Sequence, residues 1–196
     1  KWRRDIHQNP ELSNREFKTA EKIAKHLKSL GIEVQTGVAH TGVVGVLKGN
    51  NPGKVVALRA DIDALPVTER NDLPFKSNVR TEFMGVDTGV MHACGHDAHT
   101  TMLLGAARYL SENKSFSGKV IFIFQPAEEG LGGAKAMLAD KLFEKFPCDE
   151  IYGLHNWPTG ELGKVGIKPG IAMAGADFFD IKIKAFGSHA ARPEGS

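Results

Sequence analysis

Short runs of β-branched and other apolar residues alternate with longer segments of helical apolar spacing, and this alternation constrains the fold more than any other feature. The strand-like runs cover residues 33–36, 43–47, 55–60, 120–124, 150–154 and 162–167, and the helix-like segments cover 14–30, 97–110 and 134–143. The run 120–124 is continuously apolar, which is typical of a strand buried on both faces. Strands that alternate with helices predict an α/β layer fold with a mostly parallel mixed central sheet.

Local signals predict where some of these elements begin and end. Ser13 followed three residues later by Glu16 is a capping-box pattern, which predicts the start of the helix over 14–30. Residues 1–7 look like part of another helix that Asn9-Pro10 ends. The Gly- and Pro-containing segment 49–53 predicts a hairpin turn, and residues 66–91 look irregular.

The pattern changes near the C-terminal end of the chain. From Phe178 to Ala185, apolar residues alternate with Lys182 and Lys184, which predicts a long strand. We therefore expect one domain over residues 1–175 and the start of a second domain over 176–196.

Charge and composition exclude two classes of protein. Lys and Arg number 25 and Asp and Glu 23, so the net charge is only +2, and no basic block of a nucleic-acid binder is present. The sequence also lacks an apolar run of the roughly 18 residues that a membrane span needs. Cys94 and Cys148 lie in unrelated contexts, which favours free thiols and a cytoplasmic, reducing location. The chain opens at Lys1, so we also expect that an upstream segment could have been removed.

Residues that can bind metal follow several of the expected strands. They are Asp61 and Asp63 after 55–60, Glu128 and Glu129 after 120–124, His155 after 150–154, and Cys94 and His96 just before the helix at 97. Ligands of open α/β sheets bind beyond the carboxyl ends of the strands, so these groups should share one rim. Thiolate, imidazole and carboxylate together favour a borderline-soft divalent cation, and a spare carboxylate could move protons.

Each of these residues also has a structural interpretation. Cys94 and His96 could be a buried thiol beside a helix cap, and His155 could be a core histidine. The Glu128–Glu129 pair could be solvated, and the aspartates could cap turns. The remaining histidines are interpreted as surface, capping or supporting groups, with His92 and His99 as the best supporting candidates.

Other catalytic motifs are absent from the sequence. The segment 49–55 lacks the spacing of a phosphate-binding loop, and 130–133 is not a dinucleotide fingerprint. Neither a His-Glu-x-x-His motif nor a Gly-x-Ser-x-Gly elbow occurs. Cys94 as a nucleophile stays open, but metal binding explains more of the surrounding residues.

Four ordered motifs resemble the amidohydrolase branch of the M20 metallopeptidases. They are Arg59-Ala-Asp-Ile-Asp-Ala-Leu-Pro66, Met91-His-Ala-Cys-Gly-His-Asp97, Gln125-Pro-Ala-Glu-Glu-Gly130 and Gly187-Ser-His-Ala-Ala191. This branch includes hippurate hydrolases, N-acyl-amino-acid amidohydrolases, N-acetyldiaminopimelate deacetylases and auxin-conjugate hydrolases. The resemblance implies a three-layer α/β/α catalytic domain, an α+β lid that usually forms a homodimer, and two divalent metal ions (Zn, Mn, Ni or Co).

The resemblance also implies a role for each matched residue. Metal ligation falls to Cys94, His96, Glu129 and His155, and the general base and acid is Glu128. Asp63 matches an aspartate that supports the metal site, and Asp61 replaces a histidine ligand of the peptidase branches. His189 matches a lid histidine that holds the scissile carbonyl oxygen of the substrate.

The reaction expected from this resemblance is amide hydrolysis of an N-acyl amino acid by metal-activated water. A di- or tripeptide metallopeptidase of the same fold and a metal-stabilised domain without catalysis are the alternatives. The family takes a further histidine ligand from a later part of the chain. We therefore expect a truncated chain that ends inside the lid, retains metal weakly and has little activity alone.

Overall fold

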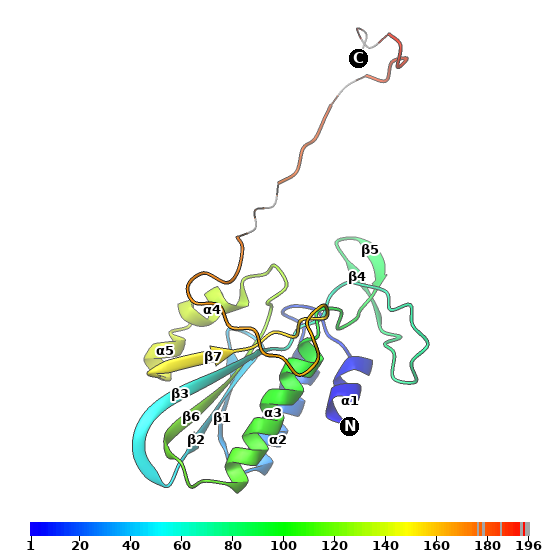
Figure 1. The fold of residues 1–196 in the computed structure, drawn as a ribbon. Helices are drawn as coiled ribbons and strands as arrows, with labels where there is room; N and C mark the ends of the chain where they lie inside the picture. Colours follow the sequence, from blue (N-terminus) through cyan, green and yellow to red (C-terminus); the bar gives the residue numbers. More distant parts are fainter. Residues whose placement is uncertain (176, 178, 185, 193, 195–196) are drawn as a thin grey trace. The chain divides into compact units, whose positions relative to one another are not determined.

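The computed structural model describes residues 1–175, 177, 179–184, 186–192 and 194. The chain forms two units, Lys1–Trp157 and Pro158–Ser196, and each is described by itself. All helices and strands assigned within the described residues belong to the first unit (Figure 1). No described helix is long and apolar enough to cross a membrane.

A five-stranded sheet forms the centre of the first unit. Its strands lie in the order β1 (Glu33–Val38), β2 (Gly42–Lys48), β6 (Ser117–Gln125), β3 (Asn51–Asp61) and β7 (Glu150–Gly153). Strand β2 pairs antiparallel with both β1 and β6, whereas β6, β3 and β7 pair in parallel. The strands β1, β6, β3 and β7 therefore run in one direction, and β2 runs in the opposite one. The predicted mostly parallel mixed sheet is therefore confirmed.

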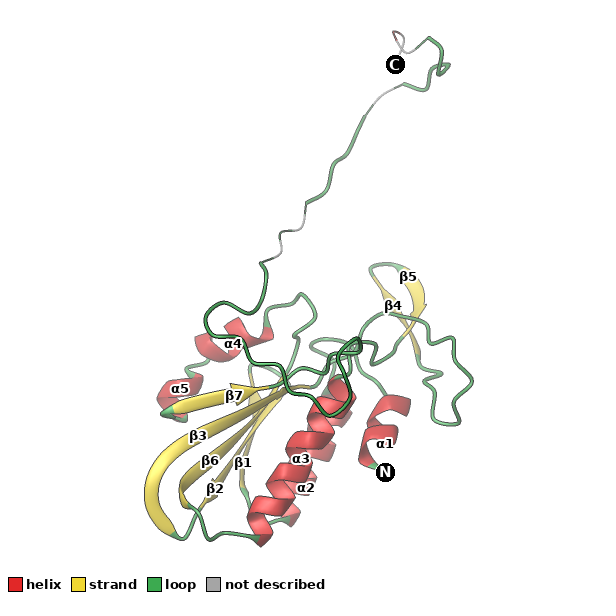
Figure 2. Cartoon of the chain, viewed as in Figure 1, coloured by secondary structure: helices red, strands yellow, loops and turns green. Residues whose placement is uncertain are grey.

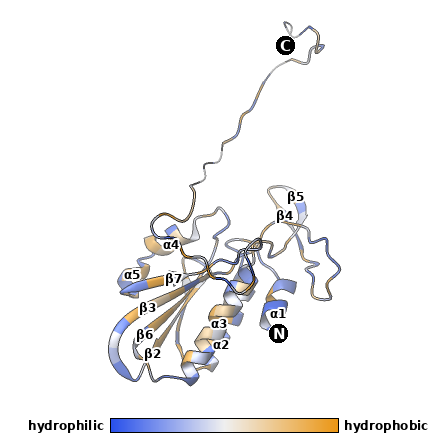
Figure 3. Ribbon diagram, in the orientation of Figure 1, coloured by the Kyte–Doolittle hydropathy of each residue, from blue (hydrophilic) through white to orange (hydrophobic). Residues whose placement is uncertain are grey.

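Helices cover both faces of this sheet, which gives three layers (Figure 2). One face packs against α2 (Phe17–Ser29) and α3 (His96–Glu112), with Ile23, Leu27 and Leu104 in the shared core. The short helix α1 (Trp2–Gln8) contacts α3. The other face packs against α4 (Gly133–Ala139) and α5 (Leu142–Lys145) through Met137 and Leu142. Figure 3 shows the hydrophobic colouring over the central strands.

The central strand β6 fixes the edge at which the site lies. Phe122 and Phe124 face one core, and Ile121 and Ile123 face the other, so the strand is buried on both faces as its continuous apolar run predicts. The register pairs Asp61 with Gln125, so β3 and β6 end at the same level. The residues that follow them therefore emerge side by side.

The predicted hairpin over 49–53 is wrong. Strands β2 and β3 are consecutive in the chain, but β6 lies between them and pairs with both. Gly49 and Asn50 donate backbone hydrogen bonds to Gly118 and Lys114 rather than closing a turn between neighbouring strands. Glycine and proline mark a change of direction, and that signal is the same for a hairpin and for a crossover.

The predicted capping box is also wrong. Helix α2 begins at Phe17, and its N-cap residue Glu16 makes no capping hydrogen bond through its side chain. The Glu11 carboxylate instead accepts hydrogen bonds from the backbone N–H groups of Lys18 and Thr19. The Ser13 hydroxyl donates its hydrogen bond to the carboxylate of Asp63, which is far away in sequence, and not to the first turn of α2.

Four further segments differ from the expectation. The stretch 66–91 contains a hairpin of β4 (Arg80–Phe83) and β5 (Val86–Gly89), and the helix over 134–143 is divided by Lys141 at a φ of 61°. Residues 162–167 form no strand, because their apolar side chains are exposed and no described strand pairs with them. In the predicted strand over 178–185, Phe178 and Ala185 lie outside the described residues, and 179–184 are not assigned to a strand.

Candidate metal centre

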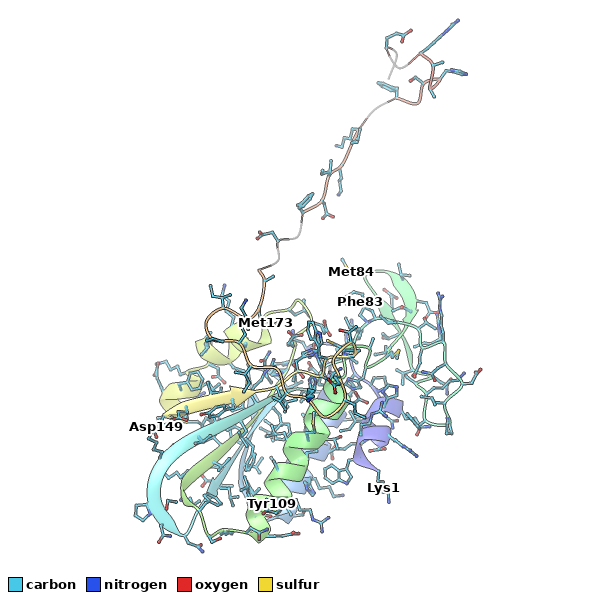
Figure 4. All side chains as sticks on the ribbon, viewed as in Figure 1. Lys1, Phe83, Met84, Tyr109, Asp149 and Met173 are labelled. Atoms are coloured by element: carbon cyan, nitrogen blue, oxygen red, sulfur yellow. The ribbon has the colours of Figure 1, made fainter. Side chains whose placement is uncertain are left out.

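The predicted site residues of the first unit gather at the edge where β3, β6 and β7 end. Asp61 ends β3, His155 follows β7, and the loop after β6 carries Glu128 and Glu129. Helix α3 begins at His96, so its N-terminus faces the same edge (Figure 4, in which Tyr109 marks the other end of α3). Four chain segments thus bring thiol, imidazole and carboxylate groups together, as the strand ends predict.

His96 lies at the centre of this group and is completely buried. Its Nδ1 donates a hydrogen bond to the backbone carbonyl of Asp63 (2.9 Å), so the proton is on Nδ1 and the lone pair of Nε2 is free. Three carboxylate oxygens surround that nitrogen, from Asp61 at 3.6 Å, Glu129 at 3.7 Å and Glu128 at 3.8 Å. Burial lowers the pKa of His96, but the neighbouring carboxylates outweigh burial and raise it. The Nε2 atom therefore favours a positive charge beside it.

Cys94 and His155 lie on the open side of His96. The Cys94 Sγ is 3.2 Å from His155 Nε2, and the His155 Nδ1 donates to the Asn156 carbonyl. The ligand atoms of Cys94, His96 and His155 all lie within 4.8 Å of one another. Burial and the charges of the nearby carboxylates raise the pKa of the Cys94 thiol to about 12. A cation at this point would therefore be needed to keep the sulfur as thiolate.

Glu128 and Glu129 form a second group with His96, again with ligand atoms within 4.8 Å of one another. The Glu129 side chain is 20% exposed and that of Glu128 is 39% exposed, so Glu129 is the inner carboxylate. Burial raises the pKa of Glu129, and the charges of Glu128 and Asp63 add to this effect. Glu128 is the more accessible carboxylate of the pair.

Asp63 and Asp61 are buried behind these groups. Burial raises the pKa of Asp63, but hydrogen bonds from His96, Ser13 and the backbone of the Glu128–Glu129 loop outweigh it and lower the pKa to about 2. Asp63 thus orients both His96 and the loop. Asp61 accepts hydrogen bonds from Arg59 (2.8 Å) and from His99 Nδ1 (2.7 Å).

Several supporting residues lie outside the set that the sequence predicts. Arg59 joins Asp61 to Gln125, the Ser13 hydroxyl donates to Asp63, and the Asn156 N–H donates to His99 Nε2 (2.9 Å). Apart from Asp61, their partners lie 50 or more residues away in sequence, so only their positions inside or beside the family-like motifs could have indicated them. His99 supports the site as expected. His92 is buried, and neither ring nitrogen forms a hydrogen bond within the described residues.

The donor atoms fit a divalent metal ion. His96 Nε2 and Glu129 Oε1 are buried without a hydrogen-bond partner among the described residues, whereas His99 and Asp61 satisfy each other. Buried polar atoms are normally paired. Two unpaired atoms with free lone pairs, His96 Nε2 and Glu129 Oε1, lie 3.7 Å apart, which indicates a missing positive partner between them. Imidazole, thiolate and carboxylate are the ligands that zinc and related cations prefer.

His189 belongs to the second unit. Its Nδ1 accepts a hydrogen bond from the backbone N–H of Ala191 at 3.2 Å. Its role in binding the substrate stays a prediction.

Gly95 is required by the backbone between Cys94 and His96. Its φ of +92° lies in the left-handed region, where a residue with a Cβ is strained, and a Cβ there would overlap the Asn156 side chain. We expect Gly95→Ala to destabilise the fold by at least about 1–2 kcal/mol, the ordinary cost of the left-handed conformation. It should also weaken metal binding, because Cys94 and His96 must shift.

Gly95 is the N-cap residue of α3, and the matched control is Gly105→Ala within that helix. A Cβ at Gly105 meets no atom within 4 Å, so alanine should stabilise α3 by about 0.5–1 kcal/mol. Urea unfolding and metal titration of both variants check these effects. Equal stability of the two variants would contradict the argument.

Comparisons with known proteins identify the family of this chain. Residues 57–194 match the model of a family described as Peptidase family M20/M25/M40. A hippurate hydrolase of Campylobacter jejuni is 50% identical over 99% of this chain and 48% of its own length. The thermostable carboxypeptidase 2 of Saccharolobus solfataricus is 48% identical over 97% of this chain and 47% of its own.

A solved structure is similar as well. The Bacillus subtilis YXEP protein, described as a dinuclear metal binding peptidase from the M20 family, is 42% identical with a TM-score of 0.77. The match covers 86% of this chain and 45% of that one. The chain thus spans about half the length of the relatives it matches.

Proposed function

The chain belongs to peptidase family M20/M25/M40, and on this premise we propose that the protein is a metal-dependent hydrolase of N-acyl amino acids. The observation that carries the proposal is the buried Nε2 of His96, which has no hydrogen-bond partner in the described part of the chain and which three carboxylates surround. The resemblance assigns four metal ligands, and Glu128 is an additional carboxylate beside them. A structural metal site closes its ligand shell, whereas a hydrolytic site needs such an extra proton carrier.

Two divalent ions are proposed for this centre. Cys94, His96, Glu129 and His155 would hold these ions, since their thiolate, imidazole and carboxylate groups gather around the buried His96 side chain. Zinc, manganese, nickel and cobalt all accept these ligands. When bound, the metal lowers the pKa of water and polarises the acyl carbonyl.

Glu128 carries the proton in the proposed mechanism. Its carboxylate takes a proton from the attacking water as the new C–O bond forms at the acyl carbon. It then gives that proton to the amide nitrogen as the C–N bond breaks, so the products are a carboxylic acid and a free amino acid. His189 is proposed to donate a hydrogen bond to the developing oxyanion.

The hydrolase of Campylobacter jejuni supports the substrate class, because hippurate is an amino acid whose nitrogen carries an acyl group. The similarity to a carboxypeptidase favours a second candidate, a metallopeptidase that cleaves peptides. The two functions share the metal centre and differ in the group on the acyl side of the scissile bond.

A substrate panel distinguishes these functions. The intact protein is stripped of metal, reconstituted separately with Zn, Mn, Co or Ni, and assayed with N-benzoyl and N-acetyl amino acids and with free dipeptides. We expect the acylated amino acids to have the higher kcat/KM and the metal-free protein to be inactive. A preference for dipeptides would select the second candidate, and equal activity without metal would reject both.

The remaining proposals concern the second unit. We propose that a lid domain begins near residue 176 and mediates a homodimer, as the resemblance implies. Light scattering of the intact protein measures this state directly.

A further inference from the structure

The segment 11–16, between Pro10 and α2, lies against both the end of β3 and the loop that carries Glu128. Leu12 forms an isolated parallel bridge with Ala64, and the Ala64 N–H donates to the Glu11 carbonyl (2.8 Å). The Glu11 carboxylate also holds the first turn of α2. The segment is therefore fixed on two sides.

Glu16 binds the backbone of the loop through its side chain. Its Oε1 accepts a hydrogen bond from the Ala127 N–H (2.8 Å), and its Oε2 accepts one from the Thr41 hydroxyl (2.6 Å). The Glu16 side chain is 0% exposed. Burial raises the pKa of this carboxyl, and the two hydrogen bonds act in the opposite direction. A fully buried acidic group is costly, so its contacts must be important to the fold or to the site.

Ala127 has an unusual backbone that this contact holds. Its φ of 49° lies in the left-handed region, and its side chain is completely buried. Alanine rarely adopts this conformation, because its Cβ crowds the following carbonyl. Such strain persists only where the surroundings enforce it.

Both neighbours of Glu128 are anchored through the same segment. On one side, Ala127 is held by Glu16. On the other, the Glu129 N–H donates to Asp63 Oδ2 (3.0 Å), which also accepts the Ser13 hydroxyl (2.6 Å). Glu128 itself is the most exposed carboxylate of the centre, so its direction depends on these anchors.

We propose that Glu16 is a positioning residue, whose hydrogen bond to the Ala127 amide sets the direction in which Glu128 enters the metal centre. The inference rests on the proposed function, because it concerns the carboxylate assigned there as proton carrier. It adds that the left-handed turn at Ala127 is maintained by a buried carboxylate that is not among the proposed metal ligands.

The test compares Glu16→Ala, Glu16→Gln and Thr41→Val in the intact, metal-loaded protein. Glu16→Ala should lower kcat by about 10- to 100-fold, as expected when a reacting group is displaced by about 1 Å, with KM changed by less than about twofold. Glu16→Gln keeps an acceptor oxygen for Ala127 and should restore most of kcat. Thr41→Val removes only the other partner of Glu16, so it should lower stability but leave kcat near that of the unchanged protein.

A second readout does not depend on turnover. Hydrogen–deuterium exchange of the Ala127 amide should be faster in Glu16→Ala than in Glu16→Gln and Thr41→Val, after matching for global stability. If Glu16→Ala does not fold, the double variant Glu16→Met with Thr41→Val replaces the buried polar pair by apolar groups of similar size. It should show the same loss of kcat and the same fast exchange.

Two results would overturn the inference. One is unchanged kcat and unchanged Ala127 exchange in Glu16→Ala, and the other is an equal loss of kcat in Thr41→Val. If the unchanged protein hydrolyses no amide, the proposed function fails first. The exchange comparison then still shows whether Glu16 holds the loop, so the two failures are distinguishable.

Discussion

Replacing Glu128 by glutamine in the intact, metal-loaded protein is expected to reduce kcat by about 10²–10⁴-fold, the usual contribution of a positioned acid or base. Glutamine has nearly the same shape, but it cannot take a proton from water or return it to the leaving nitrogen. Glu128 is the more exposed of the two adjacent glutamates, so its loss should not remove a metal ligand. Metal content should therefore stay the same.

Steady-state kinetics and elemental analysis check this prediction together. The control is Glu144→Gln, since Glu144 is an exposed glutamate on α5, remote from the strand ends. The control should keep both kcat and metal. Full activity of the Glu128→Gln variant would reject Glu128 as the proton carrier, and loss of metal would instead make Glu128 a ligand.

Replacing His96 by alanine is expected to have the largest effect on metal binding. His96 belongs to each of the three groups of side chains that could hold an ion, and its Nε2 is buried without a partner among the described residues. Loss of a residue that only orients a ligand costs about 10–100-fold in affinity, so loss of this ligand should exceed about 100-fold. Calorimetric titration of Zn or Mn into metal-free protein measures the change.

His92→Ala is the matched control for this experiment. His92 lies in the loop just before α3 and is nearly as buried as His96, and burial lowers its pKa to about 4, so it stays neutral. Since neither of its ring nitrogens forms a hydrogen bond in the described part of the chain, it orients no ligand. The control should bind metal within about tenfold of the unchanged protein. Similar losses in the two variants would show that cavity formation, not ligation, lowers the affinity.

The sequence predicts the layers and the strand ends because both depend on local pattern. The apolar run 120–124 is a buried strand, and the acidic, imidazole and thiol residues after the strands do meet at one edge. The carboxyl ends of parallel strands lie at one edge of the sheet whatever the order of the strands. The location of the site can therefore be predicted without knowing the strand order. The roles of Glu128, Asp63 and the four proposed metal ligands stay predictions.

Contacts between distant residues could not be predicted in this way. Ser13 looks like a helix cap, but its hydroxyl reaches Asp63, and Glu16 looks like the other half of the cap, but it binds Ala127. His7 was expected to be a surface, capping or supporting group, and it lies buried between Asp97 and Glu69, which the spacing could not indicate. In each case a partner from another part of the chain replaces the local interaction, and spacing along one segment carries no information about it.

The position of β6 between β2 and β3 has a consequence for how the protein folds during synthesis. Until residues 117–125 have been made, β2 and β3 each expose an unpaired edge, although both are already complete. Unpaired edges invite association with other chains, and pairing over long sequence separation is slow. The loop with Glu128 and Glu129 follows β6 directly, so the arrival of this strand joins β2 to β3 and delivers two carboxylates of the centre. The other edge of β3 stays unpaired until β7 has been made, and His155 follows that strand. The last strand of the sheet and the last of the proposed ligands of the first unit therefore arrive together.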